Sequence, residues 1–434
     1  MQKKQKGLVW FRNDLRVHDN ESLTNAIRQN DSVLAVYCFD PRHFEKMNFG
    51  FKKTEKFRAK FLIESVSKLK QNLEKLNISL LVYHQKPEDV ISEIVAKNEI
   101  NSIYFQKEWT KEEMEVLENI KGKVAHSVSF KAIYNQFLFH PEDIPFEIQS
   151  IPNVFTQFRI QCEKSTTVRP EFSVQSLSKE NCIQNETVIP TMETLGFTDF
   201  EIDSRTAFPF RGGENEAMNR LENYFWKSKK LSVYKLTRNG LLGTDFSSKF
   251  SPWLANGSIS AKTIYWEISK YEKEIEKNDS TYWLIFELIW RDYFKYVSLK
   301  NGNSIFKIGG ILDKKYEWKT NQSAINQWIN GTTEEPFVNA NMIELQQTGW
   351  MSNRGRQNVG SYFSKNLLLD WRIGAAYFEA MLLDYDIHSN YGNWMYVSGV
   401  GNDPRDRKFN IKLQAKNYDG ESKFQNLWLQ QKLF

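Results

Sequence analysis

The chain has 434 residues, enough for two or more domains that each bury a core. A net charge of +5 permits a nucleic-acid partner but does not by itself indicate one. Its three cysteines form no CxxC pair and have no histidine at zinc spacing. No apolar run approaches the ~20 residues of a membrane helix, and the N-terminus does not resemble a signal peptide. We therefore expect no disulfide framework, metal site or membrane span, and a location in the reducing cytoplasm.

The first 130 residues alternate short apolar runs with amphipathic ones. Five runs are apolar on both faces and predict strands at residues 7–11, 32–40, 78–85, 100–106 and 123–130. Between them, helical patterns cover residues 21–30, 54–76, 87–97 and 111–119. Buried strands separated by helices predict a parallel, doubly wound α/β sheet domain over residues 1–130.

Residues 131–215 are rich in proline, serine and threonine and show little periodicity, apart from a short helical pattern at 153–164. A connector this long is usually functional or packed on a second domain. The remainder, 216–434, is predicted to be an all-helical domain. Apolar residues recur at the 3.6-residue spacing of helices in segments 216–226, 260–275, 280–299, 323–331, 339–350, 359–369 and 373–385.

The segment Ser247–Gly257 places three hydroxyl side chains and Lys249 just ahead of a helix opened by Pro252. Free backbone N–H groups, hydroxyls and a cation at a helix start suit a pyrophosphate. The simpler interpretation is an ordinary helix N-cap, and spacing alone leaves both open.

Residues 339–398 combine large aromatic side chains with arginines and aspartates, a mixture that suits a pocket for a large, flat, polyphosphorylated cofactor. Arg356 and Asp384 form a candidate ion pair there, either structural or beside a flavin ring. Upstream, Glu287, Trp290 and Arg291 fall within one turn of a predicted helix. They are either a half-buried helix face or the lining of a cavity.

Several long motifs in this chain resemble the photolyase and cryptochrome family, and most of them its DASH cryptochrome branch. The resemblance covers about residues 7 to 430, with motifs in the family's order. They are VWFRNDLRVHDNESL, TRNGLLGTDFSSKFSPWLANGSIS, STYWLIFELIWRDYF, MSNRGRQNV, DWRIGAAYFE, SNYGNWMY and GVGNDPRDRKFNI.

The resemblance implies two cofactors. The sheet domain would hold an antenna chromophore, in this branch usually 5,10-methenyltetrahydrofolate, with Glu108 where a family carboxylate meets the pterin. The helical domain would hold folded FAD. The positions that match the family's FAD site are Tyr234, Ser247, Ser248, Lys249, Phe250 and Ser251 near the phosphates, Trp290, Arg291, Asn353, Arg356, Asp384 and Asp386 around the ribityl chain and ring, and Asn390 facing flavin N5.

The same resemblance implies a light-driven reaction. Trp394, Trp371 and Trp318 coincide with three tryptophans that carry electrons from the surface to photoexcited flavin; without the resemblance, each would be taken as a core tryptophan. For repair, excited reduced FAD would donate an electron to a cyclobutane pyrimidine dimer flipped out of the DNA. The residues implied at the lesion and its flanking phosphates are Glu287, Trp290, Arg238, Arg354, Tyr396 and Gln357.

Three departures from family patterns refine the expected substrate. The (6-4) photolyases have two catalytic histidines where this chain has Asn353 and Gln357, which argues against (6-4) repair. Duplex-repairing dimer photolyases have a second Trp where this chain has Tyr396, which predicts a preference for single-stranded or looped DNA. A common family Asp and Arg, four residues apart, are here Asn339 and Ile343, with an unknown effect on the lesion pocket.

Three classes of function compete. The first is a monomeric DNA-repair photolyase. The second is a flavin photoreceptor that binds nucleic acid or a partner and signals without repair, and the third is a nucleotide-binding protein without light chemistry. Asn390, the three tryptophans and the serine cluster argue against the third. Glu287, Trp290 and the lack of a long C-terminal tail favour repair over signalling.

Overall fold

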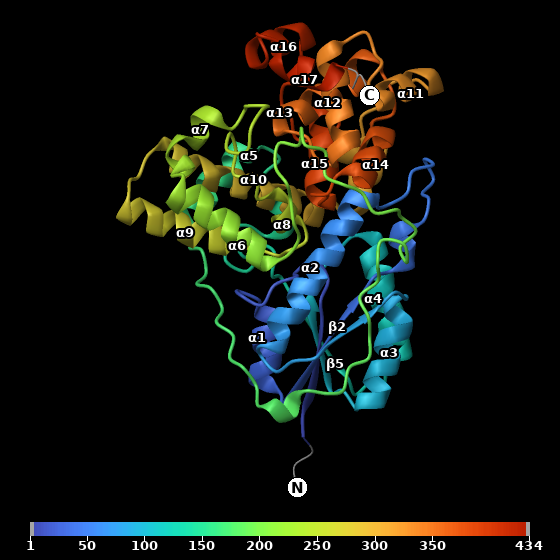
Figure 1. Cartoon of the computed structure of the whole chain (residues 1–434), viewed down its shortest axis with the longest axis vertical. Coiled ribbons are helices and arrows are strands. Elements are labelled where there is room, and N and C mark those ends of the chain that lie inside the picture. The colour runs from blue at the N-terminus through green and yellow to red at the C-terminus, as the bar shows by residue number, and fades with distance from the viewer. Residues whose placement is uncertain (1–3, 431–434) are drawn as a thin grey trace.

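The computed structural model describes residues 4–430. Its N-terminal part is a five-stranded parallel sheet in the order β3-β2-β1-β4-β5 (Figure 1). The strands are β1 (Lys6–Trp10), β2 (Ser32–Cys38), β3 (Leu80–Tyr83), β4 (Ser102–Gln106) and β5 (Ser129–Ile133). This confirms the predicted parallel α/β fold.

Helices cover both faces of the sheet. Helices α1 (Glu21–Gln29) and α2 (Lys56–Glu74) share one apolar cluster with Val9 of β1. Helices α3 (Pro87–Asn98) and α4 (Lys111–Lys123) share another with the neighbouring residues Leu8 and Trp10. Because successive residues of a strand point to opposite faces, both faces of β1 are buried, and its sequence is continuously apolar.

The fifth predicted strand, at residues 123–130, is wrong in position. The structure places β5 at Ser129–Ile133, and Val124 and Val128 pack against the core from the turn before it. Their side chains give the segment a strand-like apolar pattern without strand pairing. The true strand lies at the sheet edge with Lys131 and Ala132 exposed, so it lacks the signature of a doubly buried strand.

The connector leaves β5 and contains one substantial helix, α5 (Phe155–Ser165), close to the predicted position. Phe155 and Phe158 of α5 pack into the core of the helical part. The rest of the segment, green in Figure 1, runs down past α1 and returns along the sheet part. Asn181 and Asn185 bind backbone groups of Val33 and Leu80, so the connector is tied to the sheet by side-chain hydrogen bonds.

From Glu214 onwards the chain is helical, as predicted. The helices are α6 (Glu214–Glu222), α7 (Tyr234–Thr237), α8 (Ser251–Ala255), α9 (Ala261–Glu274), α10 (Asp279–Asn301), α11 (Gln322–Asn330), α12 (Pro336–Thr348), α13 (Asn353–Ser361), α14 (Trp371–Met381), α15 (Ile387–Ser398), α16 (Ile411–Tyr418) and α17 (Lys423–Leu429). The predicted helix at 359–369 instead covers the end of α13 and a π-helical turn at Tyr362–Asn366. The sequence patterns did not identify α7, α15, α16 or α17.

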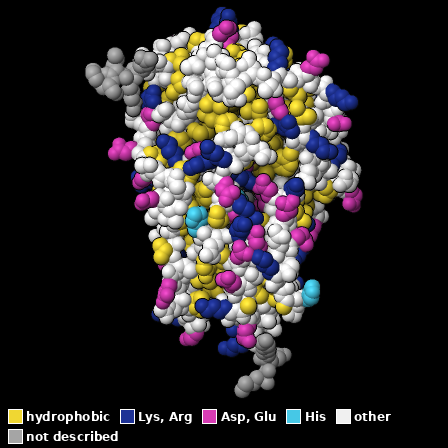
Figure 2. Space-filling view, turned by 90° about the vertical axis from the view of Figure 1, so that its right-hand side faces the viewer, with side chains coloured by type: hydrophobic (Ala, Val, Ile, Leu, Met, Phe, Trp, Pro, Cys, Tyr) yellow, Lys and Arg dark blue, Asp and Glu magenta, His cyan; other side chains and the backbone are white. Residues whose placement is uncertain are grey.

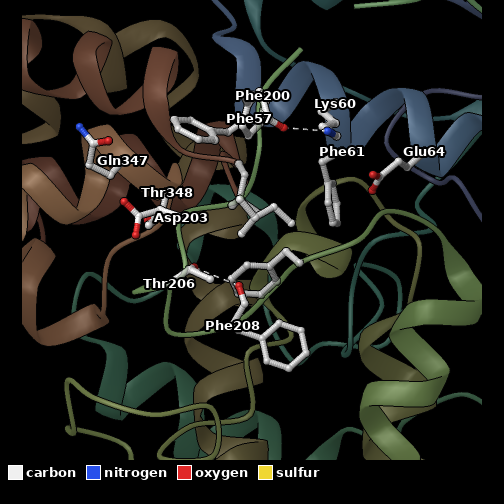
Figure 3. Close-up of a pocket in the computed structure, with 13 residues that line it drawn as sticks. Phe57, Lys60, Phe61, Glu64, Phe200, Asp203, Thr206, Phe208, Gln347 and Thr348 are labelled. Carbon is white, nitrogen blue, oxygen red and sulfur yellow. Dashed lines mark hydrogen bonds between the residues drawn. The ribbon is translucent and has the colours of Figure 1, made fainter. Parts of the chain in front are cut away.

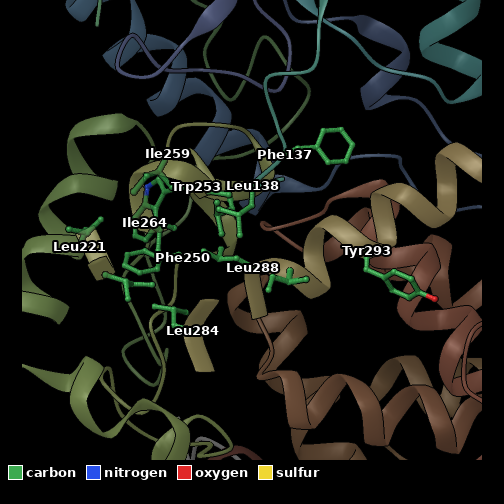
Figure 4. Close-up of a cluster of buried hydrophobic side chains, with 14 of the residues drawn as sticks. Phe137, Leu138, Leu221, Phe250, Trp253, Ile259, Ile264, Leu284, Leu288 and Tyr293 are labelled. Carbon is green, nitrogen blue, oxygen red and sulfur yellow. The ribbon is translucent and has the colours of Figure 1, made fainter. Parts of the chain in front are cut away.

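Helix α10 runs through the middle of the helical part and carries several candidate residues. It begins at a capping box, in which the side chain of Asn278 accepts hydrogen bonds from the backbone N–H groups of Ser280 and Thr281. Its buried face meets Leu221, Phe250 and Ile264 in the apolar cluster of Figure 4. This packing fixes α10 relative to α6 and α8.

In Figure 2, hydrophobic side chains gather over the upper part of one face, above a band of mixed acidic and basic side chains. Among the described residues, no helix is long and apolar enough to cross a membrane, and no group of three or more potential ligands could hold a metal ion.

Candidate active site

A cavity of about 560 Å³ opens within the helical part, between α8, α10, α13 and α15. Most of the site residues predicted from the sequence line it. They are Tyr234, Arg238, Ser247, Ser248, Lys249, Phe250, Ser251, Glu287, Trp290, Arg291, Asn353, Arg354, Arg356, Gln357, Asp384, Asp386, Asn390, Trp394 and Tyr396. Three predicted residues, Glu108, Trp318 and Trp371, lie outside the lining.

Lys249 lines the cavity without an ion-pair partner among the described residues. It is 3% exposed, and no residue between 4 and 430 makes a hydrogen bond to its Nζ atom. The ammonium lies over the rings of Phe246 and Trp350, 3.1 and 4.2 Å from their centroids. Burial lowers the pKa of Lys249 well below its usual value. A buried, unpartnered cation of this kind fits an anionic ligand group such as the diphosphate of FAD.

The predicted ion pair also lines the cavity. Arg356 of α13 binds Asp384 with a shortest distance of 2.8 Å, and its Nε donates to the carbonyl of Met351. The pair is therefore confirmed, and both partners face the cavity. Glu344, on α12, lies close enough to interact electrostatically with both Lys249 and Arg356, and burial raises its pKa to about 8.

Helix α15 presents two further cavity residues. Asp386 caps the helix by accepting from the N–H of Ser389, and it also binds Lys295 Nζ at 2.6 Å. Burial opposes ionisation, but Lys295 keeps the pKa of Asp386 far below its usual value. One turn later, Asn390 Nδ2 donates to the carbonyl of Ala375, which leaves its Oδ1 as an acceptor for a ligand.

Glu287 and Trp290 lie on one side of α10 with Arg238 and Tyr396 nearby. Glu287 forms an ion pair with Arg238 at 2.7 Å, and burial raises the pKa of its carboxyl group. Trp290 stacks on Phe155 of the connector, with ring centroids 3.6 Å apart. It also makes an edge-to-face contact with Tyr396, with ring centroids 6.1 Å apart. The connector thus supports the wall that carries Trp290, a role that the sequence did not suggest.

Arg291 and Arg354, both predicted site residues, form hydrogen bonds to other residues of the chain. Arg291 donates to the carbonyls of Gln136 and Leu254, at 2.6 and 3.0 Å. Arg354 donates to Gln357 and Asn239, both at 3.1 Å. Arg291 therefore joins α10 to the connector and α8 while lining the cavity, and Arg354 holds the rim around α13.

The three predicted tryptophans belong to a single hydrophobic cluster. Trp394 and Trp371 are buried in it, and Trp318 packs against it from nearer the surface. A Cβ atom at Gly374 would lie 2.2 Å from Cη2 of Trp394, so this glycine lets Trp394 rest against the backbone of α14, the helix that Trp371 begins. Of the three, only Trp394 lines the cavity.

Glu108 follows the carboxyl end of β4, away from the cavity. Its carboxyl group accepts from Gln106 Nε2 at 2.8 Å, and burial raises its pKa. Arg12 Nη1 and Gln106 Oε1, close by, are buried without hydrogen-bond partners among the described residues. These unpartnered polar atoms fit a second ligand at this end of the sheet.

Asn339 and Ile343 do not line the cavity. The side chain of Asn339 makes three hydrogen bonds to Thr333, at 2.7 to 2.8 Å, and Ile343 packs near Gly331. Both residues therefore pack at the turn before α12, and neither contributes a side chain to the cavity lining.

A second, smaller pocket of about 50 Å³ lies between α2, the connector and the end of α12. Figure 3 shows it lined by phenylalanines, with Lys60 donating to the carbonyl of Phe200 at its edge. It contains none of the predicted site residues.

Comparisons with known proteins cover nearly the whole chain. The DNA photolyase family model matches residues 7–176, and the model for the FAD binding domain of DNA photolyase matches residues 283–432. Cryptochrome DASH of Gloeobacter violaceus is 46% identical, covering 97% of this chain and 85% of the relative. The protein of the same name from Danio rerio is 47% identical, covering 96% and 82%.

Solved structures agree. The crystal structure of a Synechocystis cryptochrome matches with a TM-score of 0.93 and 44% identity, covering 99% of this chain and 89% of that one. An archaeal photolyase from Sulfolobus tokodaii, described as having two FAD molecules and a novel light-harvesting cofactor, matches with a TM-score of 0.77 and 26% identity, covering 98% and 90%.

Proposed function

The chain belongs to the photolyase and cryptochrome family and contains its FAD-binding domain, and we propose that it repairs cyclobutane pyrimidine dimers in single-stranded or looped DNA, driven by blue light. The observation that carries this proposal is the single cavity that unites an unpartnered cation, the Arg356–Asp384 pair and the Glu287–Trp290 wall. When bound and reduced, FAD supplies the light-driven one-electron chemistry.

We assign the phosphate end of the cavity to Ser247, Ser248, Lys249, Phe250 and Ser251. Lys249 compensates the diphosphate charge there. At the ring end, Asn390 offers Oδ1 to a ring N–H, and Asp384 is bound by Arg356. Burial of these groups keeps water from the reacting centre and strengthens their electrostatic effect.

The lesion-facing wall is formed by Glu287, Trp290 and Tyr396. Trp290 has one face against Phe155, which holds the ring in place as a platform for the flipped bases. Glu287 offers its carboxyl group to the bases, while Arg238 and Arg354 meet the flanking phosphates. Since Arg238 is bound to Glu287, DNA binding must exchange part of that ion pair for phosphate contacts.

The preference for single-stranded DNA rests on Tyr396. Its hydroxyl accepts from Arg407 Nη2 at 3.1 Å, so this wall of the cavity is polar where a tryptophan would be apolar. A polar wall stabilises an extruded dimer less, and extrusion costs least when the bases are not paired in a duplex.

We further propose that residues 1–130 form the antenna-chromophore domain, residues 131–215 the connector and residues 216–434 the FAD-binding domain. We also propose that the protein is a monomer. Methenyltetrahydrofolate is the proposed antenna ligand, because Glu108 and the unpartnered Arg12 and Gln106 atoms suit a pterin with donors and acceptors. Trp318, Trp371 and Trp394 would carry electrons that reduce FAD. Free thiols at Cys38, Cys162 and Cys182 support a reducing compartment such as the cytoplasm.

The proposal is tested by blue-light-dependent loss of thymine dimers in matched single-stranded and duplex oligonucleotides, with the bound flavin fully reduced beforehand. Repair confined to the single strand is expected. Equal rates on both substrates would remove the argument from Tyr396. No repair on either substrate would favour the alternative, a photoreceptor that signals without repair.

A further inference from the structure

Arg220 of α6 is a buried arginine that lies behind the proposed phosphate end of the cavity and does not line it. Nothing in the sequence pattern singled it out. Its guanidinium makes four hydrogen bonds. They reach Thr244 O at 3.1 Å, Asp245 Oδ1 at 2.9 Å, Ser247 O at 3.0 Å and Ser248 O at 3.0 Å. All four acceptors lie in the short segment that leads into Lys249.

These bonds decide which way the peptide groups of the segment face. In a trans peptide unit the C=O and the following N–H point in opposite directions. With the carbonyls of Ser247 and Ser248 turned towards Arg220, the N–H groups of Ser248 and Lys249 point away from it. The rings of Phe208 and Tyr224 pack against the guanidinium, at 4.9 and 4.7 Å, and restrict its position.

The next two residues continue the arrangement. Lys249 has a positive φ of 63°, and Phe250 has a right-handed φ of −76°. A left-handed residue followed by a right-handed one turns successive N–H groups towards one point and creates a concave anion site. Among the described residues, no hydrogen bond uses the backbone N–H of Ser248, Lys249, Phe250 or Ser251 as its donor. Four adjacent donors are therefore free beside the cavity.

The positive φ of Lys249 is strained for a residue with a side chain and must be held by its surroundings. Phe250 fixes one side, since its ring is buried beside Leu221, Ile264 and Leu284 (Figure 4). Arg220 fixes the other side through the four bonds. Leu221 and Arg220 are neighbours on α6, so one helix supports both ends of the turn.

We propose that Arg220 is a positioning residue for the cofactor diphosphate: it orients the Ser247–Ser251 backbone so that its N–H groups form the anion site. This inference rests on the proposed placement of the diphosphate at Ser247–Ser251. Arg220 does not touch the ligand. Its effect is confined to the phosphate end, so it alters the affinity for a flavin that carries a diphosphate and leaves the affinity for the flavin ring unchanged.

The test compares dissociation constants of FAD and riboflavin for the full-length chain after its flavin has been removed. Riboflavin lacks the diphosphate. Replacing Arg220 by methionine (Arg220→Met) is expected to weaken FAD binding by roughly tenfold or more, with riboflavin binding changed less than about twofold. Arg220→Lys, which keeps the charge but not the planar fork, should fall between wild type and Arg220→Met.

Arg16→Met is the matched control. Arg16 is equally buried and donates to the carbonyls of Asp19, Asn135 and Gly257, none of which lines the cavity. It should lower thermal stability without changing the ratio of FAD to riboflavin affinity. If Arg220→Met does not fold, Arg220→Lys is used in its place. The rate at which FAD is released from the Arg220→Lys holoprotein is then compared with the rate for the wild type.

Three results separate the possibilities. If Arg220→Met weakens both ligands in proportion, or neither, Arg220 is a structural residue only and the inference is overturned. If Lys249→Met lowers the ratio of FAD to riboflavin affinity while Arg220→Met does not, the diphosphate placement stands and only the role of Arg220 fails. If neither variant changes the ratio, the diphosphate lies elsewhere and the proposed placement fails too.

Discussion

Glu287 combines a buried position with an ion pair to Arg238, so its charge matters at the mouth of the cavity. Replacing it by glutamine (Glu287→Gln) keeps the shape and hydrogen-bonding capacity but removes the charge from both the pair and the proposed base contact. We expect dimer repair to fall by about tenfold or more, since each ~1.4 kcal/mol of lost transition-state stabilisation is a factor of ten. The FAD affinity should stay unchanged; an equal loss of FAD binding would contradict the assignment.

The buried ion pair between Asp386 and Lys295 is expected to contribute to the stability of the fold. In Asp386→Asn the side chain can still cap α15, but Lys295, which is 3% exposed, loses its counter-charge. An unpaired buried charge costs about 3 kcal/mol or more. Urea unfolding of the FAD-saturated protein at pH 7 measures this cost. The double variant Lys295→Met/Asp386→Asn should recover most of it; no recovery would show that the pair is not the cause.

Between secondary-structure elements, the side chain of Asn339 joins the turn at Thr333 to the first residues of α12. Asn339→Ala removes three hydrogen bonds and is expected to cost about 2 kcal/mol of unfolding free energy. Repair and FAD affinity should not change, since the residue lies outside the cavity lining. Asn339→Asp retains the acceptor atom and should cost less. Loss of repair in Asn339→Ala at full FAD occupancy would contradict this placement.

The sequence predicted the elements that bury an apolar stripe and missed those that do not. Helix α10 and the first four strands have strong periodic patterns, and the structure contains them near the predicted positions. Helix α15 buries Asn390 beside the cavity and His388 against Trp109 of the sheet part, so its apolar stripe is interrupted. Edge strand β5 is half exposed and was placed too early for the corresponding reason.

Motif resemblance located the cavity residues, but it could not reveal contacts made by the backbone. The residues quoted from the motifs converge on one cavity although they come from α7 to α15. Arg220 binds carbonyl groups 24 to 28 residues further along the chain, and any residue type at those positions offers a carbonyl. Likewise, nothing in the sequence indicated that Phe155 of the connector supports Trp290.

At the scale of the whole molecule, the sheet part and the helical part meet through a stacked pair, Trp109 and His388, with ring centroids 4.4 Å apart. Burial, with Lys295 nearby, lowers the pKa of His388 to about 3. Below pH 6.5 His388 becomes protonated in the unfolded chain, whereas in the folded protein it stays neutral down to about pH 3. The free energy of unfolding therefore falls as the pH falls from 6.5 to about 3.

His388→Phe keeps a ring on Trp109 and removes the titration. Between pH 7.5 and pH 5 the wild type should lose about 2 kcal/mol more unfolding free energy than the variant, from ~1.5 pH units below the ordinary histidine pKa. The charged groups that face His388 are Lys295, Asp386 and Arg291. Chemical unfolding at both pH values gives the comparison, and parallel losses in the two proteins would show that His388 is charged in the folded state.

The contact between the two parts is close at the backbone itself. Leu15 N donates to the carbonyl of Asn256, Arg16 Nη1 donates to that of Gly257, and a Cβ atom on Gly257 would lie 2.0 Å from Asn13 O. Gly257 comes two residues after α8, which borders the cavity, and Asn13 also contacts Glu108. For the antenna proposed beside Glu108, these backbone contacts set its separation from, and its orientation to, the flavin proposed in the cavity.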